Sequence, residues 1–381
     1  MTKACYVGVA GKARKVKKIY TGVANKARKV KKAYVGVGGK ARPFFSAEAK
    51  LSYYGTVTEL SSARWLLAGT TVGGYALFGG GAAHYTSSHP LYSTVDAYNT
   101  SLVRSSPTEL SQARYDIAAT TVGGYALFGG GASLAQAYNT VDAYSTSLVR
   151  STPTPLSQQK TDLAATTVGG YALFGGGNDG NLLNAQAFTT VDAYSTSLVR
   201  SNPTGLIQGR FDLAATTVGN YGMFGGGVAD GSTFTYVDAY SPALVRSNIN
   251  MSRQRTSLAA TTVGGYALFG GGATGGQVDA FNAYLVLTTT TGLSPSRNNL
   301  AATTVDGYGL FGGGSIIANF SGSATVEAYN TSLVRSTPTP LNQKRTDLAA
   351  TTVGGYALFG GGNDGGSTSL TVDAYTVDGG G

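Results

Sequence analysis

The sequence predicts an all-β fold, a seven-bladed β-propeller built from four-stranded antiparallel blades. Three observations predict it: a phrase close to YALFGGG recurs seven times, further short β-type runs flank each copy, and the two ends of the chain complete each other. The copies place their Phe 42 to 50 residues apart, which is the length of one propeller blade. These are Phe78, Phe128, Phe174, Phe224, Phe269, Phe311 and Phe359.

Each unit contains four short runs that we expect to form strands A to D. A run such as LAATTV (163–168) is joined to the following YALF run by Gly-Gly, the signal of a tight hairpin. A VDAY run and an SLVR run follow, with polar turn residues such as Asn99 between them. The small side chains of strand A suit the position nearest the axis. The Phe and Leu of strand B are expected to fill the space between neighbouring sheets, each contributing about 1.5–3 kcal/mol.

The ends of the chain predict how the ring closes. The last unit stops at VDAYTVDGGG and lacks a recognisable strand D, whereas residues 51–54 align with the strand D segment 101–104 of the first unit. We therefore expect residues 51–54 to supply the outer strand of the C-terminal blade. A ring closed in this way leaves no open sheet edge.

An Asp in strand C and an Arg in strand D recur in most units, and both invite a catalytic interpretation. An active site needs a few groups that converge at one point, whereas residues repeated in every blade form a ring. Structural pairing is therefore the expected role of these residues. The Asp are Asp96, Asp142, Asp192, Asp238 and Asp373, and the Arg are Arg104, Arg150, Arg200, Arg246 and Arg335.

The loops between strands B and C differ between units in length and chemistry, while the A–B and C–D turns are nearly fixed. In an antiparallel meander the B–C and D–A connections share one face, so the diversity is expected on that face. Loops on a rigid scaffold commonly carry recognition, although drift after duplication is the alternative. The candidate ligand-binding residues are the loop aromatics Tyr85, Tyr92, Tyr138, Phe188, Phe234, Tyr236 and Phe320.

The composition excludes several classes of protein. Cys5 is the only cysteine, so no intramolecular disulfide can form. Neither a signal peptide nor a membrane span is expected, since no run of 18 apolar residues occurs. The two histidines, His84 and His89, share one loop without a further ligand cluster. We therefore expect no enzyme activity, no catalytic residue, no metal and no cofactor.

Residues 1–45, here called the basic arm, differ sharply from residues 46–381. The arm carries 13 of the 28 Lys and Arg and none of the 19 Asp and Glu. A 14-residue phrase, YVGVAGKARKVKKI in its first copy, runs through residues 6–44 and reads as strand, turn and basic strand, or as a helical turn in its basic part. We expect two domains, the arm at 1–45 and the propeller at 46–381. The candidate anchoring residues are Lys12, Arg14, Lys15, Lys26, Arg28, Lys29, Lys40 and Arg42.

Two resemblances follow from these motifs. A hydrophobic strand that ends in Gly-Gly, a Tyr in the third strand and a recurring Arg before strand A resemble the kelch repeat over residues 51–381. Kelch units usually carry a Trp in strand D, where these units have Leu and Val, and Trp65 is the only Trp. The arm resembles the YVGV-x-GKARKVKK arrays near the N-termini of structural proteins of bacteriophages and prophages from Gram-positive bacteria.

The resemblance of the arm implies a non-enzymatic bacteriophage structural or host-attachment protein, such as a tail-fibre component, located in the virion and made in the bacterial cytoplasm. The arm would dock to other virion proteins, the loop face would bind a host-surface glycan or protein, and a homo-oligomer is expected. The alternative is a bacterial protein-interaction propeller whose basic arm binds nucleic acid. Plain solubilisation by the arm is a third interpretation.

Overall fold

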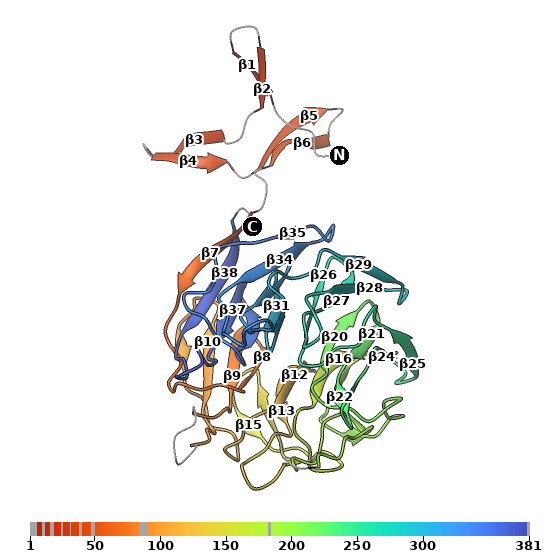
Figure 1. The fold of residues 1–381 in the computed structure, drawn as a ribbon. Coiled ribbons are helices and arrows are strands. Elements are labelled where there is room, and N and C mark those ends of the chain that lie inside the picture. The colour runs from red at the N-terminus through yellow and green to blue at the C-terminus, as the bar shows by residue number, and fades with distance from the viewer. Residues whose placement is uncertain are drawn as a thin grey trace. The chain divides into compact units, whose positions relative to one another are not determined.

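The computed structural model describes residues 50–83, 90–181 and 184–378 in full, and in residues 1–49 the backbone of six strands (Figure 1). The chain divides into two compact units, residues 1–52 with 377–381 and residues 53–376, and each is described on its own. All regular secondary structure among the described residues is β-strand. The all-β class predicted from the sequence is confirmed.

The arm forms three antiparallel hairpins, one for each copy of the 14-residue phrase, so its strand interpretation is confirmed and the helical one is wrong. The hairpins are β1 (Tyr6–Val9) with β2 (Lys12–Lys15), β3 (Ile19–Val23) with β4 (Lys26–Val30), and β5 (Lys32–Val37) with β6 (Lys40–Ser46).

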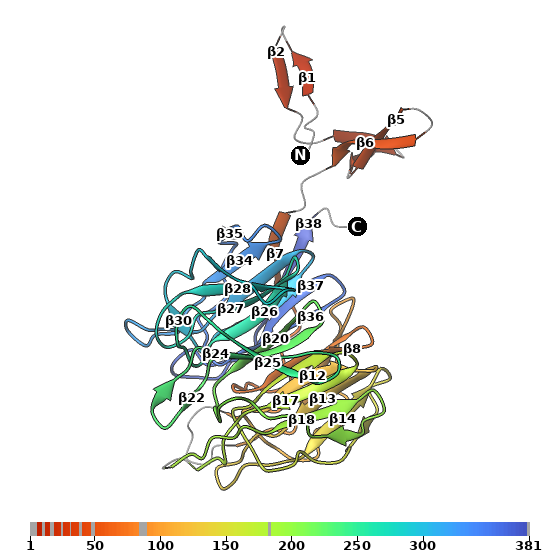
Figure 2. The ribbon, with the colours of Figure 1, turned by 90° about the vertical axis from the view of Figure 1, so that its right-hand side faces the viewer.

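Seven four-stranded antiparallel sheets form the blades, numbered 1 to 7 in the order of their YALF copies, and they surround a common axis (Figures 1 and 2). Strand A is innermost, since it contacts strand A of the next blade. The A strands are β8 (Ala68–Val72), β12 (Ala118–Val122), β16 (Ala164–Val168), β20 (Ala214–Val218), β26 (Ala259–Val263), β31 (Ala301–Val305) and β36 (Ala349–Val353). The B strands are β9 (Tyr75–Gly79), β13 (Tyr125–Gly129), β17 (Tyr171–Gly175), β21 (Tyr221–Gly225), β27 (Tyr266–Gly270), β32 (Tyr308–Gly312) and β37 (Tyr356–Gly360).

The outer half of each blade contains strands C and D. The C strands are β10 (Val95–Asn99), β14 (Val141–Ser145), β18 (Val191–Ser195), β24 (Tyr236–Tyr240), β28 (Val278–Asn282), β34 (Val326–Asn330) and β38 (Val372–Asp378). The D strands are β11 (Arg104–Ser105), β15 (Arg150–Ser151), β19 (Arg200–Ser201), β25 (Arg246–Asn250), β29 (Leu287–Thr290), β35 (Arg335–Ser336) and β7 (Lys50–Thr56). Short pairs extend the loops: β22 (Val228–Ala229) with β23 (Ser232–Thr233), and β30 (Arg297–Asn298) with β33 (Ser315–Ile316).

Strand D is shorter than the SLVR run predicts. In blade 1 it begins only at Arg104, because the preceding residues form the turn: Leu102 has φ 61° and donates its N–H to the carbonyl of Asn99. The same left-handed Leu recurs in blades 2 to 6. The SLV part of the run is therefore turn, and only the Arg and its successor are strand in most blades.

The ring closes as predicted from the chain ends. Strand β7 pairs with β38 and completes blade 7, so the outermost strand of the C-terminal blade comes from the start of the propeller. The hydroxyl of Tyr53 donates to Asp373 at 2.7 Å, and the rings of Tyr53 and Tyr375 are 5.2 Å apart. Closure thus joins the first and last segments of the propeller by backbone and side-chain contacts.

The core lies between adjacent blades. Leu77 of blade 1 packs with Phe128 and Tyr144 of blade 2, and all three side chains are fully buried. Phe128 meets Tyr144 edge to face with centroids 5.9 Å apart. A Cβ on Gly79 would lie 2.8 Å from the Phe128 ring, so the first Gly of GGG gives the ring of the next blade room.

Threonines of strand A join the blades at the axis. Thr70 and Thr121 share a hydrogen bond between their hydroxyls at 3.0 Å, and the Thr121 hydroxyl also donates to the carbonyl of Thr71 at 2.6 Å. The same pair of bonds links blades 2 and 3 through Thr120 and Thr167. The Thr-Thr pair in every unit is therefore explained by cross-blade bonding.

The fixed turns pack against each other on the face opposite the B–C loops. Gly73, the first Gly of the A–B turn in blade 1, has φ 53°, and a Cβ there would lie 2.7 Å from Cβ of Thr146 in the C–D turn of blade 2. Equivalent contacts join Gly123 to Thr196 and Gly264 to Thr331. Packing therefore fixes these turns, whereas the B–C loops are free to differ.

Candidate functional site

The repeated Asp of strand C is a buried structural centre. Asp142 accepts hydrogen bonds from Arg114 at 2.9 Å and Arg150 at 3.2 Å, and from the N–H of Ser111 at 3.1 Å. Arg114 precedes strand A and is fully buried, whereas a quarter of the Arg150 side chain is exposed. The predicted structural pairing is confirmed. The buried acids are Asp96, Asp142, Asp192, Asp238, Asp279, Glu327 and Asp373.

Four of the predicted loop aromatics occupy one repeated backbone position. The N–H of Tyr92 donates to the carbonyl of Gly81 at 2.9 Å, and the carbonyl of Tyr92 accepts from the N–H of Arg114 in the next blade at 3.3 Å. Tyr138, Phe188 and Phe234 make the same two bonds in their blades, and all four side chains are partly buried. Ser369 fills this position in blade 7, so the backbone joint does not require an aromatic ring.

The remaining predicted aromatics are Tyr236, Phe320 and Tyr85. Tyr236 stacks on Phe234 with centroids 5.5 Å apart, and Phe320 is 83% exposed at a loop tip with φ 54°. Phe188 also borders a polar cavity of about 440 Å³. Tyr85 lies outside the described residues. None of the described cavities is lined by more than one of the predicted aromatics.

The predicted anchoring residues fall on the second strand of each arm hairpin. Strand β2 carries Lys12, Arg14 and Lys15, β4 carries Lys26, Arg28 and Lys29, and β6 carries Lys40 and Arg42. Their side chains lie outside the described residues. Their anchoring role stays a prediction.

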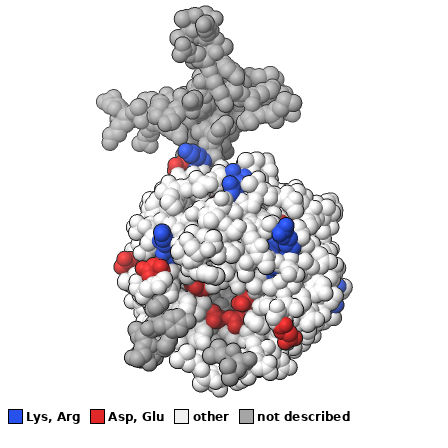
Figure 3. Space-filling model, viewed as in Figure 1, with Lys and Arg blue, Asp and Glu red and all other residues white. Residues whose placement is uncertain are grey.

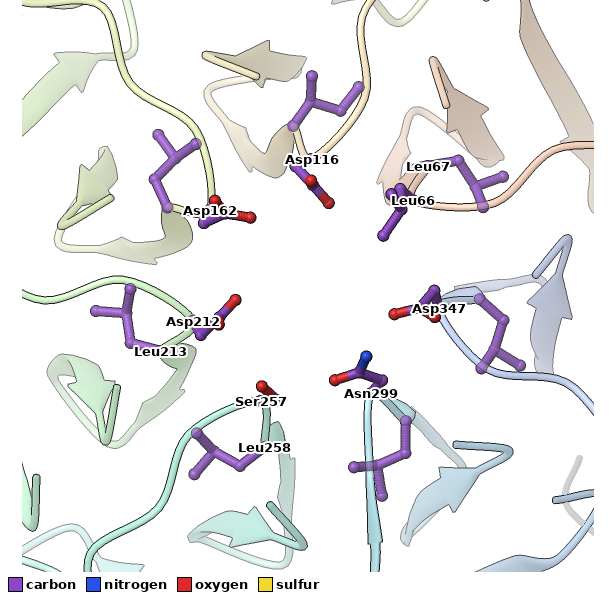
Figure 4. Close-up of a pocket in the computed structure, with 14 residues that line it drawn as sticks. Leu66, Leu67, Asp116, Asp162, Asp212, Leu213, Ser257, Leu258, Asn299 and Asp347 are labelled. Atoms are coloured by element: carbon purple, nitrogen blue, oxygen red, sulfur yellow. The ribbon is translucent and has the colours of Figure 1, made fainter. Parts of the chain in front are cut away.

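Seven residues form a ring around the axis where the chain enters strand A. Each has a left-handed φ between 50° and 54°, and the N–H of Asp116 donates to the carbonyl of Leu66 at 3.1 Å. The same blade-to-blade bond recurs at Asp212 and Asp347. Figure 4 shows the polar side chains of the ring pointing into the central opening. The ring, here called the axial ring, contains Leu66, Asp116, Asp162, Asp212, Ser257, Asn299 and Asp347.

The four carboxyl groups of the axial ring crowd one cavity of about 300 Å³. Burial, followed by the charges of Asp162 and Asp347, raises the pKa of Asp212 to about 7, and burial raises the pKa of Asp347 to about 6. Burial and the neighbouring Asp162 also raise the pKa of Asp116 well above its usual range. The axial ring therefore holds protons near neutral pH. In Figure 3, acidic side chains gather at a hollow in the face seen there.

A second cavity of about 490 Å³, here called the aromatic cavity, adjoins the axial ring on the loop face. It shares Asp116 and Asp162 with the axial cavity. Trp65, Tyr115 and Phe211 line it, each one residue after the buried Arg of its blade, and each is partly buried. The exposed Leu134 and the amides of Asn178 and Asn181 complete a mixed wall. The volume lies within the usual range for small-ligand pockets.

Sequence reasoning missed this cavity, although a signal for it was present. The two residues after the buried Arg or Lys read Trp-Leu, Tyr-Asp, Thr-Asp, Phe-Asp, Thr-Ser, Asn-Asn and Thr-Asp in blades 1 to 7. They vary within an otherwise constant stretch, and they belong to the D–A connection rather than to the long B–C loops. The differences between units at these two positions indicate both the axial ring and its aromatic neighbours.

Two kinds of feature, a metal-ligand cluster and a membrane-spanning helix, are absent from the described residues. They contain no group of three or more His, Cys, Asp or Glu placed to hold a metal ion. No helix long and apolar enough to cross a membrane occurs in that part of the chain.

The comparisons with known proteins support the fold. No family model matches the sequence, and no curated protein matches it. A solved structure titled "Structure of YjhT" superposes with a TM-score of 0.55 at 12% identity, covering 84% of this chain and 99% of that one. At this identity the likeness shows the fold alone. The chain is a seven-bladed β-propeller, and its similarity to kelch repeats stays a resemblance.

Proposed function

We propose that the propeller binds a cell-surface glycan in the aromatic cavity, without catalysis. The observation that carries this proposal is the grouping of Trp65, Tyr115 and Phe211 around one opening beside hydrogen-bonding carboxylates and amides. Sugar rings present apolar faces edged by hydroxyls, so they suit a wall of aromatic faces and polar groups. Pockets with a few convergent polar groups are the usual form of small-ligand sites.

The placement of the cavity supports binding to a specific ligand. The aromatic residues come from blades 1, 2 and 4, whereas blades 5 to 7 carry Thr256, Asn298 and Thr346 at the same position. The sevenfold repeat is therefore broken at one side of the axis. A group of residues that departs from the repeat and converges at one point fits a recognition site better than a structural ring does.

We propose further that the protein is a bacteriophage structural or host-attachment component, with its basic arm docked to other virion proteins. The support is the resemblance of the 14-residue phrase, together with the fact that each of its three copies forms one antiparallel hairpin. The glycan would then belong to the surface of the bacterial host. Homo-oligomerisation through the arm belongs to the same proposal.

A glycan array probed with the full chain tests the binding proposal. The wild-type chain is expected to bind a defined set of glycans, and Trp65→Ala and Phe211→Ala are expected to weaken that binding at least about tenfold, since a lost aromatic contact costs roughly 1.4 kcal/mol or more. Tyr284→Ala is the matched control, because Tyr284 is an 87% exposed aromatic on a C–D turn of the opposite face. Equal loss in all three variants, or binding to no glycan, would contradict the proposal.

Nucleic-acid binding by the arm is the second candidate, favoured by 13 cations and no acid in residues 1–45. Neutralised phosphates release counterions, so such binding would weaken steeply with salt. Filter binding of a DNA duplex to the full chain and to residues 46–381 decides it. Binding that disappears without the arm supports this candidate, and binding that persists in the shorter chain rules out the arm as its source.

A further inference from the structure

We propose that the ligand of the aromatic cavity is an amino sugar with a free, protonated amine. The inference rests on the proposed glycan-binding function and names the class of glycan. Its first basis is charge: the described residues that line the axial and aromatic cavities include four carboxyl groups and neither Lys nor Arg.

The cations that lie behind the cavity are already paired. Arg114 is fully buried and bonds Asp142, and Lys160 is fully buried with its Nζ 3.1 Å from Asp192. Neither is therefore free to neutralise the axial ring. Asp162 receives one hydrogen bond from the amide of Asn178 at 2.9 Å, which is a neutral partner.

Protons therefore offset the repulsion between these carboxyl groups. The titratable groups that the described residues place around this position are Asp116, Asp162, Asp212 and Asp347, with the phenol of Tyr115 on the aromatic side. A ligand ammonium at the wall shared by the two cavities would replace the bound protons with a fixed positive charge. Carboxyl groups that share protons respond in this way to a nearby cation.

The aromatic side of the cavity favours the same ligand. Trp65 and Tyr115 supply π faces beside Asp116, and an ammonium group is attracted to the faces of Trp and Tyr. Aromatic rings that combine with carboxylates to surround a cation form a recurring recognition site for ammonium groups. The sugar ring attached to the amine would still pack on the remaining aromatic and apolar surface, including Phe211 and Leu134.

The same charges work against acidic sugars. A carboxylate or phosphate on the ligand would face Asp116 and Asp162 with no cation nearby in the described wall, and juxtaposed like charges are strongly unfavourable. An N-acetylated sugar keeps its apolar face and loses the positive charge. The preference is therefore expected to run from free amine through neutral sugar to acidic sugar.

Isothermal titration of the full chain with a short β-1,4-linked glucosamine oligosaccharide, and with its N-acetylated counterpart, tests the inference. The amine form is expected to bind at least about tenfold more tightly, as a desolvated cation between carboxylates and aromatic rings would. Its affinity is expected to rise with pH as Asp347 and Asp212 lose their protons, for as long as the sugar amine itself stays protonated. Titrations in two buffers of different ionisation enthalpy are expected to show proton release from the protein.

Charge variants locate the effect. Asp116→Asn and Asp162→Asn are expected to abolish the preference for the amine and the proton release, and they fit the backbone because Asn299 already occupies this left-handed position in blade 6. Asp364→Asn removes an exposed carboxylate from a loop of blade 7 and is expected to change neither. Melting temperatures equal to or higher than that of the wild type show that the variants fold, since a carboxyl group whose pKa is raised by folding lowers stability near neutral pH.

The outcomes separate this inference from the proposed function. Equal or tighter binding of the N-acetylated form that still depends on Trp65 overturns the amine preference and leaves glycan binding in place. No binding of either form overturns the amine inference, and the glycan array then decides the proposed function. A preference that survives both Asp→Asn variants overturns the assignment to the axial ring.

Discussion

At the scale of single residues, the carboxyl groups of the axial ring face a cavity whose described lining contains neither Lys nor Arg. Asp212 accepts an N–H from Ser257 through its carbonyl and directs its carboxyl group into the axial cavity (Figure 4). Burial and two neighbouring carboxylates raise its pKa to about 7. Four carboxyl groups around one cavity do not favour stability, so the axial ring fits the proposed binding role better than a purely structural one.

Asp212→Asn is expected to stabilise the protein above neutral pH. A carboxyl group whose pKa is raised by folding binds more protons in the native state, so it lowers the free energy of unfolding as pH rises from about 4 to about 7. We expect the variant to be more stable than the wild type by up to about 4 kcal/mol at about pH 8, because the pKa is raised by about three units and each unit corresponds to about 1.4 kcal/mol, and equal to it near about pH 4. Thermal unfolding across this range measures it. A constant difference between the two proteins at all pH values would contradict the raised pKa.

Substitutions in the buried ion pairs are expected to lower the free energy of unfolding. Asp142→Ala leaves the fully buried Arg114 without its carboxylate, which is expected to cost about 3–5 kcal/mol. Arg150→Ala removes the partly exposed partner of the same Asp and is expected to cost about 1 kcal/mol or less. Urea unfolding of both variants gives the comparison. Similar losses of stability in the two variants would contradict the idea that the buried pair of Asp142 matters more than its partly exposed pair.

Individual strands fit together through close contacts that the repeat preserves. In β13 the last residue, Gly129, faces the ring of Phe174 in the next blade, and an added Cβ would lie 2.7 Å from that ring. The same contact recurs between neighbouring blades, and the last one joins Gly360 of blade 7 to Phe78 of blade 1. The constant GGG phrase is therefore explained by packing between blades rather than by ligand binding.

Gly129→Ala is expected to destabilise the protein by about 1–3 kcal/mol, because the new methyl group must displace a packed aromatic ring. Gly366→Ala is the control, since the nearest atom to its added Cβ is Oδ1 of Asp364 at 3.7 Å. A change within about 0.5 kcal/mol is expected there. Equal melting temperatures for the Gly129 variant and the wild type would show that the Phe174 ring moves aside without cost and would contradict the packing argument.

The sequence was sufficient to predict most elements but not the site. Repetition marks what every blade needs, so the strands, the Gly turns and the pairing role of Asp142 follow from constant residues. A binding site consists of departures from the repeat, and the most visible departures were the long loops. Tyr92 and Tyr138 lie in those loops, where their backbone groups form hydrogen bonds between blades. Trp65 and Tyr115, which line the aromatic cavity, come instead from the short D–A connections. Which variable positions converge depends on the radius of the ring, and sequence spacing does not give that distance.

Closure of the seven blades holds the axial ring and the aromatic cavity together. Blade 7 takes its outer strand, β7, from the start of the propeller, and Tyr53 there supplies Asp373 with the partner that an Arg supplies in blade 1. Strand A of blade 7 contacts strand A of blades 1 and 6, so disruption of blade 7 is expected to disturb both neighbours at the axis. The proposed ligand site is therefore expected to require that β7 and β38 close the ring.

Two truncations test closure. Removal of residues 1–45 retains β7 and is expected to leave thermal stability nearly unchanged. Removal of residues 1–56 deletes β7, exposes the edge of β38 and is expected to lower the melting temperature by about 5 °C or more or to cause aggregation. Calorimetry with light scattering measures both effects. Equal stability of the two truncated proteins would contradict closure by β7.

The central claim is that the aromatic cavity is where ligand binds, and the chain offers a direct probe of it. Trp65 is the only tryptophan and lines that cavity, so its fluorescence reports on the site alone. Titration of the full chain with a glycan that it binds on the array is expected to change the Trp65 emission saturably, with the same midpoint as calorimetric binding. Binding by calorimetry with no change in Trp65 emission would place the ligand elsewhere and contradict the account.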